Sequence, residues 1–363
     1  MSSLRELLAA AVAQGAADVH LKLGQPPIFR IHSDLVTQNF QPLTADQLVA
    51  IAQDLIPPHI RPQYEAHHEA DFSHQEEGVG RFRATVFNTQ LVPAFALRYV
   101  KTSIPSFAAL GLPPILQKIA LTPRGIVLAT GSTGSGKSTT LAALVECINQ
   151  SLTRRIITIE DPVEFLFTDA RSVISQREVG LDTPSFNAGL RHVLRQDPDI
   201  IMIGEMRDAE SFSAALQASE TGHLIFSTLH TDTAGQAVTR ILNFFPPDQR
   251  DQIRMSLATN LQAVVCQRLV PANKGGVMPA VEIMLNTPTV RKMMEKNSLE
   301  KLPAAIETGG EDGMQTFNQA LYALIKAGTV NEQSGMQYAS NPEALKMNLK
   351  GIFLDEARRI LST

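Results

Sequence analysis

The sequence predicts an α/β protein of two domains, the larger of which is built on a mostly parallel β-sheet. Three observations predict this: a length of 363 residues, short apolar runs that alternate with helical stretches between positions 126 and 243, and a glycine-rich loop directly after one of those runs. A chain of this length exceeds the usual size of one hydrophobic core. Alternation of strands and helices is typical of a parallel sheet with helices on both faces.

The N-terminal part of the chain predicts a small α+β domain. A short amphipathic helix is expected after Arg5, and proline and glycine punctuate positions 102–114, which indicates a linker. We therefore place the N-terminal domain at 1–101, the linker at 102–114 and the second domain at 115–363, with a helical C-terminal region from about 285. The expected strands are Val19–Leu23, Pro27–Ile31, Phe82–Asn88 and Ala94–Val100, and the expected helices lie near Ala45–Leu55 and Pro62–His68.

The second domain shows the alternating pattern of a parallel sheet. Its expected strands are Ile126–Ala129, Ile156–Ile159, Ile200–Ile203 and Leu224–Thr228, and its expected helices are Thr139–Asn149, Phe186–Leu194, Asp208–Ser219 and Thr233–Asn243. After about Pro246 the pattern is mostly helical. Apolar residues recur at helical spacing in Ile253–Val265, Phe317–Ile325 and Leu349–Leu361.

Composition and charge exclude several classes of protein. No apolar stretch approaches the length of a membrane span. Lysine and arginine number 32 against 36 acidic residues, which gives a formal net charge of −4, so nucleic acid is not expected as a direct partner. The two cysteines, Cys147 and Cys266, lie in apolar patterns that read as helical. They are too few for a disulfide framework or a four-cysteine zinc site, so we expect buried thiols in a reducing cytoplasm and no structural zinc.

The glycine-rich loop has the phosphate-binding pattern G-x-x-x-x-G-K-[ST], because Gly131–Ser138 reads GSTGSGKS. In such a loop the glycines allow successive backbone N–H groups to face the phosphates, Lys137 reaches the β- and γ-phosphates, and Ser138 offers its hydroxyl to Mg²⁺. The following helix directs its positive end at the same anion. The sequence therefore predicts binding of a nucleoside triphosphate with Mg²⁺ by Gly131, Ser132, Thr133, Gly134, Ser135, Gly136, Lys137, Ser138 and Thr139.

Two acidic segments follow expected strands of the same sheet. Glu205 comes directly after the apolar run Ile200–Ile203 and Gly204, where a carboxylate can polarise the attacking water of a phosphoryl transfer. Glu160, Asp161 and Glu164 surround a proline after the strand Ile156–Ile159 and indicate Mg²⁺ handling. The alternatives are a surface glutamate in a turn for Glu205 and a solvated turn for the other three acids.

After the loop and the two acidic segments, the fourth motif is an apolar strand with a histidine at each end, His223 and His230. Two histidines seven positions apart do not lie on one face of a strand, so a shared metal site is not expected. An imidazole in this place can sense the γ-phosphate instead. The alternative is that each histidine is an ordinary structural residue.

The order and wording of these four pieces resemble the secretion and type IV pilus ATPase superfamily, in which Walker A, aspartate box, Walker B and histidine box follow one another in this order. The stretches Gly15–Leu21 and Gly313–Phe317 also resemble this superfamily, so the likeness covers essentially the whole chain. The short N-terminal region, the wording Gly-Glu-Met-Arg-Asp at 204–208 and the cysteine count are most similar to the PilT-like pilus retraction ATPases.

The resemblance implies a RecA-like P-loop ATPase domain with a helical C-terminal extension, preceded by a PAS-like domain. It implies a homo-hexameric ring in which ATP lies between the N-terminal domain of one subunit and the RecA-like domain that binds it. Glu205 would be the general base, Glu164 would be a second essential acid, and Lys137 would be the third catalytic residue. His223 and His230 would sense the nucleotide. Family arginines that reach the phosphates match Arg83, Arg98, Arg191 and Arg195, each of which could instead be an ordinary surface arginine.

The resemblance also implies a function: ATP hydrolysis that powers type IV pilus retraction and twitching motility. The protein would be cytoplasmic and peripheral to the bacterial inner membrane, held there by a pilus platform protein and other pilus machinery. One stretch departs from the family, because Thr289–Lys296 keeps only the apolar spacing and Arg291 of the helix implicated in retraction. The function of an accessory retraction motor therefore remains an alternative.

Three other functions remain as alternatives. A pilus assembly or type II secretion ATPase has the same fold, and the missing four-cysteine motif argues against it. A RecA-like nucleic-acid translocase would need a basic channel with aromatic residues, which the net charge of −4 does not favour. A nucleotide-binding scaffold without turnover does not fit the intact Lys137, Ser138 and Glu205.

Overall fold

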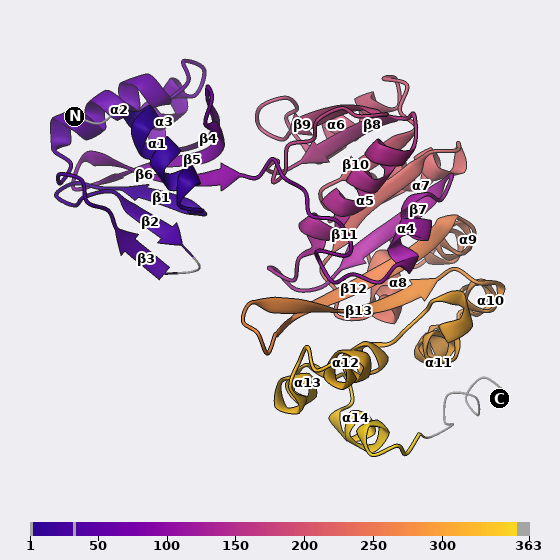
Figure 1. Cartoon of the computed structure of the whole chain (residues 1–363). Coiled ribbons are helices and arrows are strands. Elements are labelled where there is room, and N and C mark those ends of the chain that lie inside the picture. The colour runs from indigo at the N-terminus through magenta and orange to yellow at the C-terminus, as the bar shows by residue number, and fades with distance from the viewer. Residues whose placement is uncertain (1–2, 32–33, 354–363) are drawn as a thin grey trace. The chain divides into compact units, whose positions relative to one another are not determined.

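Two units make up the chain, and the structure, a computed structural model, describes residues 3–31 and 34–353 of it (Figure 1). Unit 1 comprises Met1–Ser103 and Pro162–Leu166, and unit 2 comprises Ile104–Asp161 and Phe167–Thr363. This division differs from the expected one in two places. The segment from Ile104 is part of unit 2, because Leu112 is buried in its core, and the short segment Pro162–Leu166 returns to unit 1.

Unit 1 is a six-stranded antiparallel sheet in the order β3-β2-β1-β6-β5-β4, with helices packed on one face (Figure 1). Its core is formed by alternate strand residues such as Phe29, Phe82 and Leu97, together with Leu8 and Leu48 from the helices. Helices α1 and α2 each begin with a capping box, from Ser3 and Thr44. The elements are α1 (Leu4–Ala13), β1 (Asp18–Leu21), β2 (Ile28–Ile31), β3 (Asp34–Thr37), α2 (Ala45–Leu55), α3 (Arg61–His67), β4 (Glu69–Glu76), β5 (Gly80–Thr89) and β6 (Val92–Val100).

The segment Pro162–Leu166 attaches to the end of β6. Phe165 forms a parallel bridge with Lys101, and the backbone N–H of Leu166 donates to the carbonyl oxygen of Lys101 over 3.0 Å. Val163 and Phe165 are buried. Glu164 therefore belongs to unit 1, although the strand that precedes it belongs to unit 2.

Unit 2 contains a seven-stranded sheet in the order β13-β12-β7-β11-β10-β8-β9. All neighbouring strands are parallel except the β12–β13 pair. β11 lies between β7, which precedes the glycine-rich loop, and β10, which precedes Glu205. The strands are β7 (Gly125–Thr130), β8 (Arg155–Glu160), β9 (Val173–Glu178), β10 (Ile200–Ile203), β11 (Leu224–Leu229), β12 (Leu261–Pro271) and β13 (Val277–Leu285).

Helices cover both faces of this sheet. Ile156, Val127 and Phe226 pack on the first face with α4 and α5, whereas Ile157, Leu128 and Ile225 pack on the second face with α6 to α12. The helices are α4 (Ile115–Ala120), α5 (Lys137–Ser151), α6 (Phe186–Val193), α7 (Ala209–Glu220), α8 (Ala234–Asn243), α9 (Arg250–Asn260), α10 (Pro288–Glu295), α11 (Leu302–Thr308), α12 (Phe317–Lys326), α13 (Glu332–Tyr338) and α14 (Pro342–Leu349), with 3₁₀ turns at Leu299–Lys301 and Gly310–Asp312. In the described ranges, no helix is both long and apolar enough to cross a bilayer.

The prediction of helix over Ile253–Val265 was wrong in its second half. α9 ends at Asn260, and β12 begins at Leu261 and continues past Cys266, which was also read as helical. Both faces of β12 are covered, so Ala263, Val264 and Val265 are all buried and the alternation that marks a half-exposed strand is lost. β13 was missed for the same reason. Of the helix expected at Leu349–Leu361, residues 354–361 lie outside the described part of the chain.

Candidate nucleotide site

The chemistry-bearing segments of unit 2 meet at one edge of its sheet. The strands β7, β11, β10 and β8 are parallel neighbours, so their carboxyl ends share that edge. The glycine-rich loop follows β7, Glu205 follows β10, His230 follows β11, and Glu160 ends β8. The structure therefore brings these four predicted pieces together.

The loop has the backbone conformation that its glycines permit. Gly131, Gly134 and Gly136 all have positive φ angles, of 142°, 78° and 91°. Gly136 is the N-cap residue of α5, so the first turn of that helix, with its unpaired N–H groups, opens directly onto the loop. The hydroxyl of Ser135 is buried and, within the described residues, has no hydrogen-bond partner. Phosphate oxygens fit this arrangement, because they would satisfy both the N–H groups and this hydroxyl.

Replacing Gly131 by alanine is expected to destabilise unit 2 more than replacing Gly134. A Cβ at Gly131 would lie 2.5 Å from the carbonyl oxygen of Gln267 and 2.6 Å from the Ser135 hydroxyl, whereas a Cβ at Gly134 meets nothing within 4 Å. Both changes strain the backbone by about 1–3 kcal/mol, and the clash at Gly131 adds about 1–3 kcal/mol. Urea unfolding of the two variants measures the difference. Equal free energies of unfolding would contradict the close packing of the loop on β12.

Lys137 and Ser138 stand at the start of α5, as the sequence predicts. The Lys137 ammonium group donates to the carbonyl oxygens of Gly131 and Ser132, over 2.9 and 2.8 Å, so it folds back over the loop. Ser138 is half-buried, and its hydroxyl makes no hydrogen bond to any residue that the structure describes. That hydroxyl is available to a cation, and a P-loop site needs only one or two protein oxygens because phosphates and water complete the shell of Mg²⁺.

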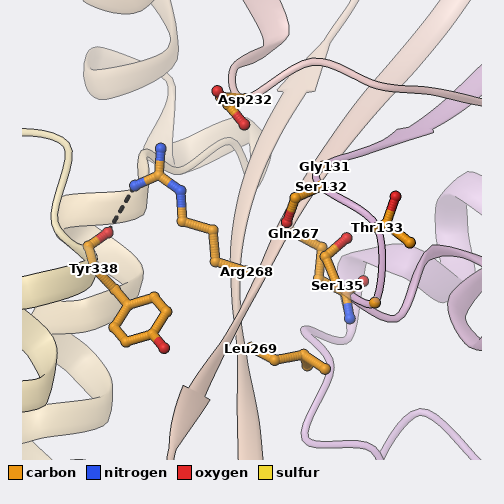
Figure 2. A pocket seen from close by; sticks show the side chains of 10 residues that line it. Gly131, Ser132, Thr133, Ser135, Asp232, Gln267, Arg268, Leu269 and Tyr338 are labelled. Carbon is orange, nitrogen blue, oxygen red and sulfur yellow. Dashed lines mark hydrogen bonds between the residues drawn. The ribbon is translucent and has the colours of Figure 1, made fainter.

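A pocket of about 360 Å³ lies beside the loop (Figure 2). Its second wall comes from β12: Gln267 and Leu269 lie toward the loop, whereas Arg268 points toward Tyr338 of α13. Arg268 donates to the carbonyl oxygen of Tyr338 over 2.7 Å and lies 3.8 Å from the ring centre of Phe317, which fixes its position. The sequence reasoning missed this wall, since β12 was read as helix. The pocket is lined by Gly131, Ser132, Thr133, Gly134, Ser135, Asp232, Gln267, Arg268, Leu269 and Tyr338.

The Glu205 carboxylate lies between the guanidinium of Arg207 and the imidazole of His230. It forms an ion pair with Arg207, and its second oxygen is 3.7 Å from Nε2 of His230. The hydrogen bond to Glu205 raises the pKa of the Arg207 guanidinium, and the charge of Asp161 adds to this effect. The pairing of Glu205 with His230 brings these two segments together. Arg207 was not expected, although it stands two residues after Glu205 in the sequence.

The other acids of the site divide between the two units. The buried Glu160 accepts hydrogen bonds from Thr158 over 2.5 Å and from Gln176 over 3.0 Å, so other side chains of unit 2 fix its carboxylate. Asp161 is exposed and acts electrostatically on Arg207. Glu164 acts electrostatically on Arg98, and both residues belong to unit 1.

His223 does not lie at this edge of the sheet. It precedes β11, so it lies at the amino end of a strand whose carboxyl end carries His230. Its Nδ1 is 2.8 Å from the carbonyl oxygen of Ala218 and 3.1 Å from the hydroxyl of Thr221, at the end of α7. These contacts hold the His223 ring at the amino end of β11, and its role toward the nucleotide stays a prediction.

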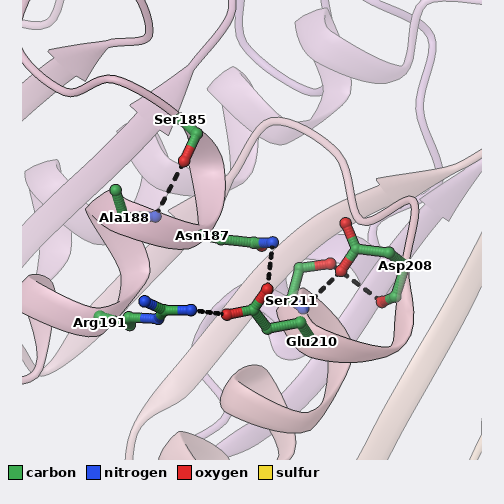
Figure 3. A network of polar contacts seen from close by, with 7 residues as sticks. All are labelled: Ser185, Asn187, Ala188, Arg191, Asp208, Glu210 and Ser211. Atoms are coloured by element: carbon green, nitrogen blue, oxygen red, sulfur yellow. Dashed lines mark hydrogen bonds and ion pairs between the residues drawn. The ribbon is translucent and has the colours of Figure 1, made fainter.

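The four predicted arginines also lie in different places. Arg191 forms an ion pair with Glu210, which Asn187 also contacts, in a surface network between α6 and α7 (Figure 3). Arg195 is exposed, and its side chain makes no hydrogen bond or ion pair within the described ranges. Neither residue lines the pocket beside the loop. Arg83 and Arg98 lie on β5 and β6 of unit 1.

These features define a class. The phosphate-binding loop lies between the buried strand β7 and α5, and the Glu205 carboxylate follows β10, which is separated from β7 in the sheet by β11. This is the arrangement of a RecA-like P-loop ATPase. Residues 3–298 match the family model of type II/IV secretion system proteins. The chain belongs to this family, and it is an ATP hydrolase.

Individual relatives extend over almost the whole chain. The type IV pilus retraction ATPase PilT of Pseudomonas aeruginosa is 39% identical over 340 residues, which is 94% of this chain and 99% of the relative. The type IV pilus ATPase PilU of the same organism is 38% identical, over 95% of this chain and 91% of the relative. A crystal structure of the pilus retraction motor PilT with bound ADP matches with a TM-score of 0.89 and 40% identity, over 95% of this chain and 99% of that one. The resemblance to pilus retraction ATPases and the predicted fold class are thereby confirmed.

Proposed function

We propose that this chain is the subunit of a homo-hexameric motor that hydrolyses ATP to retract type IV pili. The observation that carries this is the full-length similarity to PilT, combined with the meeting of the loop, Glu205 and His230 at one sheet edge. The motor works in the cytoplasm, peripheral to the inner membrane, and acts on pilus machinery that includes a membrane platform protein. Nucleic acid is not a direct partner.

In this proposal the loop holds the phosphates and Ser138 contributes its hydroxyl to Mg²⁺, which neutralises the charge that develops on the phosphates. Lys137 leaves the loop carbonyls to bind phosphate oxygens. Glu205 orients the attacking water and accepts its proton, while His230 and Arg207 hold that carboxylate in place. Arg83 and Arg98 of a neighbouring subunit complete the site, and Glu164 moves with them as a second essential acid.

A specific observation favours a second candidate, an accessory retraction motor. The similarity to PilU is almost as high as that to PilT, at 38% against 39% identity. In addition, α10 at Pro288–Glu295 lacks most of the family's retraction pattern. Its buried residues, Val290 and Met294, belong to the apolar spacing that the stretch keeps.

Deletion of the gene is expected to give hyperpiliated cells that do not twitch, because pili extend without being withdrawn. Electron microscopy of surface pili and a twitching assay measure this, with complementation by the wild-type chain and by Glu205→Gln as the matched pair. Restoration by the wild type alone links the phenotype to hydrolysis. Bald cells would contradict retraction and favour assembly, and normal pili with reduced twitching under load would favour the accessory motor.

A further inference from the structure

One row of polar residues crosses the unit 1 sheet on the face opposite to its core. Asp18 on β1 is paired directly with Arg30 on β2 and with Arg98 on β6, and Arg98 is paired in turn with Arg83 on β5. Successive side chains of a strand point to opposite faces, so directly paired residues share a face. The adjacent row is entirely buried in the core and consists of Phe29, Val19, Leu97, Ala84 and Phe72.

Two guanidinium groups of this row, of Arg98 and Arg83, stand at paired positions, and the Asp18 carboxylate forms its ion pair with Arg98. Arg83 is directly opposite Arg98, and like charges in that relation destabilise a sheet. Among the residues that the structure describes, the guanidinium group of Arg83 makes no hydrogen bond or ion pair. A phosphate between the two arginines would remove the repulsion, because guanidinium groups pair bidentately with phosphate oxygens.

Asp18 determines how Arg98 is presented. The carboxylate is buried, with 8% exposure, and accepts a hydrogen bond of 2.7 Å from Nε of Arg98, while its other oxygen is 3.6 Å from Nε of Arg30. This hydrogen bond is the main cause of the raised pKa of Arg98, and the charge of Glu164 adds to it. Because Asp18 uses the inner nitrogen, both terminal nitrogens of Arg98 stay available, on a side chain that is 68% exposed.

We propose that Asp18 is a positioning residue for ATP hydrolysis. It holds Arg98 so that the two terminal nitrogens, beside the unpaired Arg83, meet the phosphate oxygens of the nucleotide bound by a neighbouring subunit. This inference rests on the proposed function, in which unit 1 arginines complete the site. It adds a residue that touches no nucleotide and acts only through Arg98.

The test is a double-mutant cycle in full-length rings, with kcat and KM for ATP as the readout. Asp18→Asn is expected to lower kcat roughly ten- to a hundredfold, because misplacing a catalytic group by about 1 Å has this effect. Arg98→Ala is expected to lower kcat at least as far. The double variant should match Arg98→Ala alone, since Asp18 then has nothing left to position.

Asp71→Asn is the matched control. Asp71 on β4 lies on the same face of the sheet, two residues before Ser73, which pairs with Arg83. It accepts a hydrogen bond of 2.5 Å from Thr85 rather than from an arginine. Its substitution is expected to leave kcat unchanged. If Asp18→Asn prevents folding, Asp18→Glu replaces it in the cycle, since it keeps the carboxylate but displaces it by one methylene.

Two results would overturn the positioning role: an unchanged kcat in the Asp18 variant, or a further loss when that variant is combined with Arg98→Ala. A failure of the proposed function looks different. In that case Arg98→Ala by itself leaves kcat at the wild-type level, so no arginine of unit 1 assists hydrolysis and the role of Asp18 falls with it.

Discussion

Lys137→Ala is expected to lower ATP hydrolysis by more than about 100-fold, because it removes the positive group nearest to the transferred phosphate. The ammonium group is buried and already lies against the loop carbonyls of Gly131 and Ser132. Phosphate release at saturating ATP measures the loss. Binding of a fluorescent ATP analogue should weaken in the same variant, since Lys137 contacts the phosphates before and during the reaction.

The control for Lys137 is Lys274→Ala. Lys274 is exposed in the turn between β12 and β13, and its loss should leave turnover unchanged. Thermal unfolding of both variants distinguishes lost chemistry from lost folding. Undiminished hydrolysis by folded Lys137→Ala would remove the loop from the reaction.

Glu205→Gln is expected to separate binding from hydrolysis. The amide keeps the shape of the side chain but cannot accept a proton, so kcat should fall roughly 100- to 10,000-fold while ATP affinity stays close to that of the wild type. Isothermal titration with ATP and single-turnover hydrolysis measure the two quantities. An equal loss of binding would show that Glu205 holds the nucleotide rather than the water.

Glu210→Gln provides the matched comparison for Glu205. Glu210 is also paired with an arginine, Arg191, but in the surface network between α6 and α7. Its substitution should leave kcat unchanged if Arg191 serves packing within the chain. A marked loss would instead support the predicted contact of Arg191 with nucleotide across a subunit boundary.

The part of the site that could be predicted from sequence is the part that depends on parallel strand ends. Each of the strands β7, β8 and β10 ends in a motif, and parallel topology brings those ends together without any knowledge of packing. His223 and His230 stand at opposite ends of β11, so parallel topology brings only His230 to the edge that carries the loop.

The pocket wall could not be predicted, for a different reason. Gln267, Arg268 and Leu269 lie on a strand buried on both faces, whose apolar pattern is indistinguishable from that of a helix. Tyr338 reaches the pocket from α13, seventy residues further along the chain from Arg268. Such a contact depends on tertiary packing, and no local pattern indicates it.

The return of Pro162–Leu166 to unit 1 has a consequence for how the chain can be divided. The backbone passes between the two units at three points, after Ser103, after Asp161 and after Leu166. Neither unit can therefore be excised as one uninterrupted fragment. A chain that begins at Ile104 would keep Phe165 and Leu166 but lose Lys101, the residue with which both of them pair.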